Sequence, residues 1–159
     1  MSSSGRPALE SVALALVLLV ACTEARAPGG NDPRADPRDP VKVSLGAKLY
    51  SQHCAVCHGA KLEGQAQWRE RGKNGRMPAP PHDESGHTWH HPDRVLFGIT
   101  KSGLVPPYAP AGYASDMPAF GDKLFDDEIW AVLAFIKSHW RSRELLQTRV
   151  EMIGNEGKR

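Results

Sequence analysis

The chain has 159 residues, with 20 lysines and arginines against 18 aspartates and glutamates, and a formal net charge of +2 at pH 7. This length suits one domain and little more. Because the charges nearly balance and no basic stripe follows a helix, we expect no binding to nucleic acid. The sequence also lacks an evident phosphate-binding loop, nucleophile–base pair or pair of catalytic carboxylates, so we expect no enzymatic activity.

The first 21 residues have the pattern of a secretory signal peptide. Arg6 lies near the start, and an apolar run of nine residues follows from Val12 to Val20. A run of this length is too short to cross a bilayer as a helix, but it matches the apolar region of a signal. We predict a signal peptide at 1–21, with an uncleaved anchor or a buried helix as the alternative.

Cys22 closes this run in the tetrapeptide Leu19-Val20-Ala21-Cys22, which resembles the lipobox of bacterial lipoproteins. In that class the cysteine receives a diacylglycerol and becomes the new N-terminus. The alternative is ordinary cleavage nearby, which would leave a spare thiol in an oxidising compartment. We expect Cys22 to be lipidated, so that the protein is held at a membrane in the periplasm or cell envelope without a spanning helix.

Residues 22–42 are expected to form the lipidated N-terminus and a tether. The stretch from Pro28 to Pro40 contains four prolines and balanced charges, and it has no apolar periodicity. Such a composition predicts an extended, solvated segment. A tether of this kind would let an anchored domain swing between two partners.

The pentapeptide Cys54-Ala55-Val56-Cys57-His58 is the most specific motif of the chain. C-x-x-C-H is the attachment signature of a c-type haem. Two thiols on one helical turn can each add to a vinyl group of the same porphyrin, and His58 is then placed under the ring to bind iron. A redox C-x-x-C would need a preceding strand, and a zinc site would need two more ligands at suitable spacing. We therefore expect one covalent haem c.

Three helices are predicted within a folded domain at 43–141. They cover about 43–54, about 92–102 and about 126–141, and each has apolar residues at helical spacing. No convincing alternating strand pattern is present, and the connections are rich in proline and glycine. The sequence thus predicts an all-α domain, followed by a charged tail at 142–159 that is frayed in part.

The loop between the first two predicted helices is rich in histidine. Between residues 78 and 93 it carries three carboxylates and four histidines, which are His82, His87, His90 and His91. This composition allows a copper or zinc site as one hypothesis. Solvated loop histidines are the simpler interpretation.

From about residue 43 to residue 140 the chain resembles the class I cytochromes c. The resemblance is carried by Gly46, Tyr50, the haem motif with Gly59, Met117-Pro118-Ala119-Phe120, and the last helix from Ile129 to Lys137. It implies three main helices with long loops wrapped around one covalent haem. It also implies that the first and last helices cross at Gly46, with Tyr50, Val132 and Phe135 packing around the crossing.

One residue departs from that family's pattern. Its last helix often opens with Ser or Thr three residues before Glu, but Phe125 occupies that place before Glu128. We expect Asp126 to cap the helix instead, which moves its start by one residue.

The resemblance further implies the ligands of the haem iron. The family's sixth ligand is a methionine on the loop before the last helix, and Met117 matches it, with Met77 as the competing candidate. A thioether ligand favours Fe(II) and raises the reduction potential relative to two histidines. Pro80 or Pro81 would accept a hydrogen bond from His58 through a backbone carbonyl. Trp89 is expected near a haem edge or a propionate.

Together these features predict a monomeric, membrane-tethered, single-haem electron carrier that cycles between Fe(II) and Fe(III). Its partners would be redox donor and acceptor proteins outside the cytoplasmic membrane. Two alternatives stay open: a haem sensor or peroxidase-like protein with an open iron site, and a copper-handling protein using the loop 82–91. A basic stretch that contains Lys61, Arg69, Arg71, Lys73 and Arg76 would steer the protein toward an acidic partner, with an ordinary solvated loop as the alternative interpretation.

Overall fold

The structure is a computed structural model of the chain, and it describes residues 32–142. Within this range it contains helices and no strand, which confirms the all-α class. The predicted signal at 1–21, Cys22 and the tail beyond Ser142 lie outside the described residues. In chain order the elements are η1 (Pro33–Ala35), α1 (Pro40–His53), α2 (Ala55–His58), η2 (Thr88–His90), α3 (Asp93–Ser102) and α4 (Asp126–Lys137).

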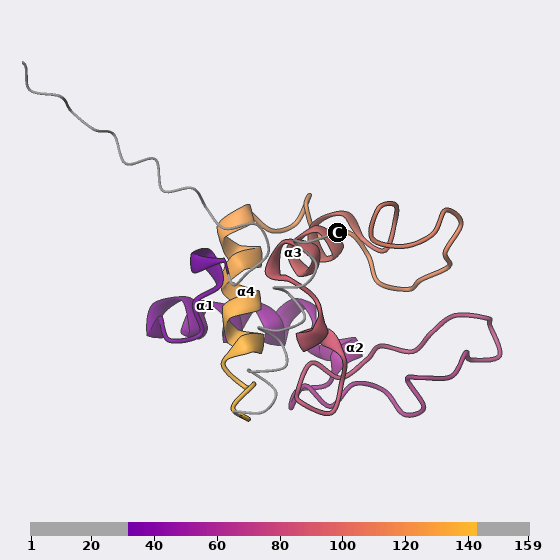
Figure 1. Cartoon of the computed structure of the whole chain (residues 1–159), viewed down its shortest axis with the longest axis horizontal. Coiled ribbons are helices and arrows are strands. Elements are labelled where there is room, and N and C mark those ends of the chain that lie inside the picture. The colour runs from indigo at the N-terminus through magenta and orange to yellow at the C-terminus, as the bar shows by residue number, and fades with distance from the viewer. Residues whose placement is uncertain (1–31, 143–159) are drawn as a thin grey trace, which may run out of the picture.

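The α4 helix stands between α1 and α3 and forms the centre of the core (Figure 1). Its sequence is apolar on nearly every side from Ile129 onward, and most of its side chains are buried. Phe97 of α3 stacks on Trp130 of α4 with 4.3 Å between ring centroids. Long loops that follow α2 and α3 extend to the same side of these helices, away from α1 (Figure 1).

The crossing of α1 and α4 depends on Gly46. A Cβ atom at this position would lie 2.0 Å from the carbonyl oxygen of Ala131 and 2.8 Å from Cβ of Phe135. The two backbones can therefore approach this closely only because the residue has no side chain. The Tyr50 ring packs on Phe135 at 5.3 Å, and Val132 is buried in the same core cluster. This is the arrangement that the resemblance implied.

The α1 helix begins at Pro40, three residues before the predicted start. The Asp39 carboxylate accepts hydrogen bonds from the backbone N–H groups of Val41 and Lys42, at 3.0 and 3.2 Å. An aspartate cap followed by proline at the first helical position is a strong start signal, because proline has no N–H to satisfy and its φ is already helical. This local signal outweighs the proline-rich composition around it.

The segment before α1 packs against the domain from Asp32 onward. Ala35 is fully buried, and the Arg34 guanidinium lies 4.2 Å from the ring centroid of Trp130. The backbone N–H of Asp32 donates to the Asp93 carboxylate at 2.7 Å. The part of the expected tether that the structure describes is therefore docked on α3 and α4 rather than extended into solvent.

Asp93 also forms a buried ion pair with Lys137. The Lys137 ammonium lies 2.6 Å from the Asp93 carboxylate, and the two side chains are 4% and 0% exposed. Because Asp93 is the first residue of α3 and Lys137 the last of α4, the pair joins opposite ends of two helices.

The capping prediction for α4 was wrong. Phe125 precedes the helix, and its backbone N–H donates to the Glu128 carboxylate at 2.8 Å. Asp126 is the first residue within the helix, and its carboxylate forms an ion pair with the Lys101 ammonium at 2.6 Å. Glu128 thus supplies half of a capping box, and the missing hydroxyl at Phe125 is not replaced.

The α4 helix ends at Lys137, before the predicted boundary at 141. The chain nevertheless stays on the core, because Trp140 is buried and its indole N–H donates to the carbonyl of His82 at 2.9 Å. None of the helices between residues 32 and 142 has the length and hydropathy of a membrane-spanning segment.

Candidate haem site

The two cysteines of the motif lie on one helical turn at the junction of α1 and α2. The backbone N–H groups of Cys57 and His58 both donate to the carbonyl of Cys54, at 3.1 and 2.9 Å. Cys54 is partly buried against the core, whereas Cys57 is exposed, and neither of the two forms a disulfide. Burial raises the pKa of the Cys54 thiol to about 11. Residues three apart on a helix share one face, so both sulfurs can reach one flat group.

His58 is held in one tautomer by the loop that follows. Its ring is 8% exposed, and Nδ1 lies 2.8 Å from the carbonyl oxygen of Pro80. A carbonyl only accepts hydrogen bonds, so this contact assigns the proton to Nδ1 and leaves the Nε2 lone pair for a metal. Burial lowers the pKa of His58, while the bond to Pro80 opposes that shift. The imidazole is therefore neutral, as a ligand must be.

Pro80, and not Pro81, faces His58. The sequence left both prolines open, and the structure gives them different partners. The Pro81 carbonyl accepts the hydroxyl of Thr88 at 3.2 Å. The chain reaches this position because Gly64, at φ +70°, lies so close to the prolines that a Cβ atom would be 2.5 Å from the Pro81 nitrogen.

Tyr50 supports the end of the haem motif from the side of α1. Its hydroxyl lies 3.3 Å from the carbonyl of His58 and 3.0 Å from that of Gly59. Burial raises the pKa of Tyr50, so its hydroxyl keeps its proton and acts as the donor. Gly59 has φ +80°, which ends α2 and turns the chain toward the loop.

His82 is the neighbour of the site that sequence reasoning missed. Its ring stacks on that of His58, with 3.9 Å between centroids and 21° between planes. Its Nδ1 lies 2.9 Å from the Thr88 hydroxyl. Burial, with a smaller contribution from His58, lowers the pKa of His82 well below its usual range. No spacing rule separates this histidine from the three that follow it.

The other three histidines of this loop contact rings other than that of His58. His87 stacks on Trp68 at 5.3 Å and meets His91 edge-on at 5.6 Å. His90 packs on Trp89 at 3.7 Å. Among residues 32–142 no group of three or more His, Cys, Asp or Glu side chains is placed to hold a metal ion. The described geometry therefore gives the copper-site hypothesis no support.

Trp89 lies at the border of the core and is partly buried. Its indole N–H donates to the carbonyl of Gly86 at 3.1 Å. A contact of Trp89 with a haem edge would therefore use the ring, because the N–H already has a protein acceptor.

Met117 lies on the loop between α3 and α4 and packs against the same core cluster as Cys54. Its backbone N–H donates to the Ser115 hydroxyl at 3.0 Å. Arg76, from the loop after the haem motif, donates to the Ser115 carbonyl at 3.3 Å and pairs with the Asp116 carboxylate. Met77 is also half-buried, but it is not among the described side chains packed on this core.

The donor set fits a covalently bound haem. It comprises two thiols on one turn and a buried imidazole whose Nδ1 is already used, together with a thioether at the border of the core. This combination suits c-type attachment.

Comparison with known proteins agrees with this chemistry. The family model described as "Cytochrome c" matches residues 43–140. Neither the curated proteins nor the solved structures gave a match to the chain. The matched segment contains α1 from its fourth residue onward, the haem motif, both long loops and α4. With most of its length matched, and with cysteines at the attachment spacing, the chain belongs to the cytochrome c family and binds haem c covalently.

Proposed function

We propose that this haem-binding electron carrier uses His58 and Met117 as the axial ligands of its iron and works tethered to a membrane. The observation that carries the ligand proposal is the 2.8 Å contact between His58 Nδ1 and the Pro80 carbonyl. It presents a neutral imidazole in the one tautomer that can ligate through Nε2. Bound haem supplies a one-electron couple at its iron.

Each residue of the site has a separate task in this proposal. Cys54 and Cys57 hold the group covalently, so the carrier cannot lose it by dissociation. The Pro80 carbonyl orients the His58 ring and makes its imidazole a more basic metal ligand. Met117 would hold the iron as a soft thioether ligand and so favour the reduced state. Together with His58 it would leave no ligand position for water or a substrate.

Covalent attachment is tested by mass spectrometry of the mature protein. The mass should include one haem that survives acid–acetone extraction. Extractable haem would contradict attachment through the two cysteines.

The second ligand is tested by comparing two methionine variants. The oxidised protein should show the far-red band of methionine–Fe(III) ligation. Met117→Ala should abolish that band and lower the potential, whereas Met77→Ala should leave both nearly unchanged. The opposite pattern would assign the ligand to Met77. Carbon monoxide binding to the reduced parent protein at neutral pH would instead favour the open-site alternative.

Membrane tethering rests on the sequence around Cys22, which lies outside the described residues. Expressed with its native N-terminus, the protein should fractionate with membranes of the cell envelope. Cys22→Ser should release it or stall its processing. A substituted protein that matures normally and stays membrane-bound would contradict lipidation. Its size in solution after removal of the anchor should be that of a monomer.

A further inference from the structure

The backbone of His82 is held by hydrogen bonds at both its N–H and its carbonyl group. Its backbone N–H donates to the Leu62 carbonyl at 2.8 Å, and its own carbonyl accepts the indole N–H of Trp140 at 2.9 Å. Both backbone groups are therefore fixed by residues far apart in the chain. These backbone contacts fix the direction of the Cα–Cβ bond of His82 independently of any contact that its ring makes.

The ring of His82 is oriented by a chain of two hydrogen bonds. Nδ1 of His82 lies 2.9 Å from the hydroxyl of Thr88, and that hydroxyl lies 3.2 Å from the Pro81 carbonyl. A hydroxyl has one proton, and the Pro81 carbonyl can only accept it. Nδ1 of His82 is therefore the donor to Thr88, and the two bonds reinforce each other in this direction.

The oriented ring lies flat against His58. The centroids are 3.9 Å apart and the planes differ by 21°. Two restraints thus act on the His58 imidazole in different directions. The Pro80 carbonyl holds Nδ1 within the plane of the ring, whereas the flat neighbour opposes rotation of the ring about its Cβ–Cγ bond.

We propose that His82 is a positioning residue for the proximal ligand, because its ring, aligned by Thr88, fixes the plane of the His58 imidazole relative to the haem. This inference rests on the proposed ligation by His58. Leucine would fill a similar volume, but it has no flat face and no donor for Thr88. A flat aromatic side chain at 82 should therefore hold the plane of His58 more closely to that of the parent than a branched aliphatic one does.

The matched variants are His82→Phe and His82→Leu. Both remove the hydrogen bond to Thr88 and the ring nitrogens, and both are apolar, so their difference isolates the flat face. His90→Leu serves as the control, because His90 lies in the same loop but packs on Trp89. Thr88→Val tests the alignment while keeping the ring of His82.

The readout is the pattern of haem-methyl proton shifts in the oxidised holoprotein, which follows the plane of the axial imidazole. Thermal unfolding is measured in parallel. We expect His90→Leu to keep the parent pattern and potential, and His82→Phe, which keeps the flat face but loses the bond to Thr88, to differ from the parent no more than Thr88→Val does. His82→Leu should redistribute the methyl shifts and change the potential, and Thr88→Val should change the pattern in the same direction to a smaller extent.

Equal patterns in His82→Phe and His82→Leu, whether both shifted or both unchanged, would overturn the proposal. If His82→Leu fails to assemble with haem, Thr88→Val carries the test, and a parent pattern in that variant also overturns the proposal. A parent protein without histidine–haem low-spin signals would instead refute ligation by His58, so the two failures are distinguishable.

Discussion

Removing the ammonium of Lys137 should destabilise the protein far more than removing a lysine from a surface ion pair. Lys137 and Asp93 are 4% and 0% exposed and lie 2.6 Å apart. Lys137→Met keeps the length of the aliphatic side chain but removes the ammonium that lies 2.6 Å from the buried Asp93 carboxylate. Breaking a buried pair in this way costs about 3–5 kcal/mol. For a domain of this size, a loss of about 3 kcal/mol lowers Tm by roughly 12 °C or more.

The control is Lys101→Met, which breaks the ion pair with Asp126. Those two side chains are 42% and 55% exposed, so the loss should be about 1 kcal/mol or less. The double variant Lys137→Met/Asp93→Leu should regain much of the lost stability, because the buried carboxylate is removed together with the ammonium. The reasoning fails if Lys137→Met costs no more than Lys101→Met in denaturant unfolding of the holoprotein.

The same pair also holds the N-terminal segment. The Asp93 carboxylate accepts the backbone N–H of Asp32, and Arg34 covers Trp130. Replacing Asp93 should therefore free this segment, and trypsin should cleave after Arg34 faster than in the parent protein. Unchanged cleavage at Arg34 would show that the segment is held without Asp93.

Three further predictions concern the crossing, the histidine loop and docking. Gly46→Ala should lower the free energy of unfolding by about 1–3 kcal/mol, because the new Cβ would lie 2.0 Å from a backbone oxygen of α4, and an unchanged denaturation midpoint would contradict this. Burial, with smaller electrostatic contributions from His91, His90 and Arg69, lowers the pKa of His87, so its NMR titration midpoint should lie below 6.5. The unfolded chain then binds the proton more readily, so the contribution of His87 to stability is lost as pH falls from 6.5 through the folded-state pKa, and a midpoint at or above 6.5 would refute this. Charge reversal of Arg69 and Arg71 should slow electron transfer to an acidic partner severalfold at low salt without changing the potential, whereas Arg94→Glu on α3 should not; rates indifferent to salt would exclude steering.

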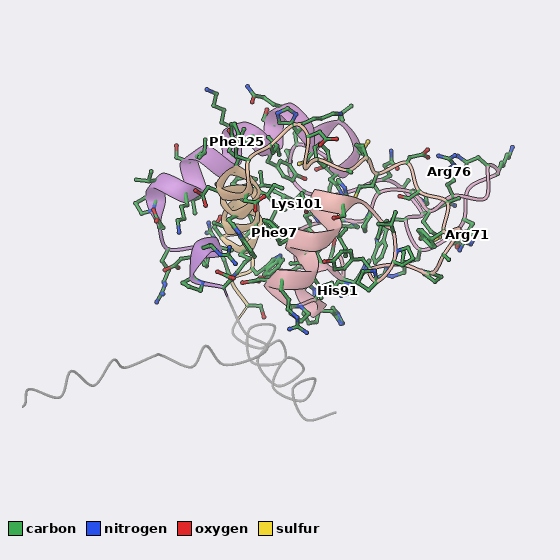
Figure 2. The ribbon with its side chains drawn as sticks, turned by 90° about the horizontal axis from the view of Figure 1, so that it is seen from above. Arg71, Arg76, His91, Phe97, Lys101 and Phe125 are labelled. Atoms are coloured by element: carbon green, nitrogen blue, oxygen red, sulfur yellow. The ribbon has the colours of Figure 1, made fainter. Side chains whose placement is uncertain are left out.

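The docking prediction gains a specific geometry from the structure. Figure 2 shows Arg71 and Arg76 at the outer end of the loop that follows the haem motif. Arg76 is already paired with Asp116, and Arg71 lies 5.7 Å from the ring centroid of Tyr113. The two loops that follow α2 and α3 are therefore joined through this basic stretch. A partner attracted to it would contact the segment that carries Met117.

Local signals in the sequence predicted most of the scaffold. The haem motif and the apolar stripe of the last helix depend on short-range spacing that physical rules interpret directly, whereas the crossing at Gly46 was implied by the family resemblance. The start of α1 was missed although its signal is local, because Asp39 and Pro40 stand in a proline-rich run that indicates a linker. The sequence shows that the Phe125 side chain cannot cap the helix. It does not show that the Glu128 carboxylate alone forms the capping hydrogen bond.

Features that join distant residues could not be predicted in the same way. The Asp93–Lys137 pair spans 44 positions, and the bond from Trp140 to His82 spans 58. Four histidines within ten residues have no periodicity, so no rule selects the one that faces inward. His82 stacks on His58, whereas His87 stacks on Trp68. This difference arises only when the loop folds back on the core.

These long-range contacts give α4 and the chain just beyond it a second role. Packing against α1 at Gly46, against Phe97 of α3 and against Arg34 before α1 explains why the helix is apolar on nearly every side. Trp140, three residues past its end, donates to the His82 carbonyl, and the His82 ring lies on His58. A change at the end of α4 can therefore reach the proximal ligand through one hydrogen bond and one ring contact. Trp140→Phe keeps the buried ring but removes that donor, so it should disturb the His58 environment more than its small loss of buried volume would suggest.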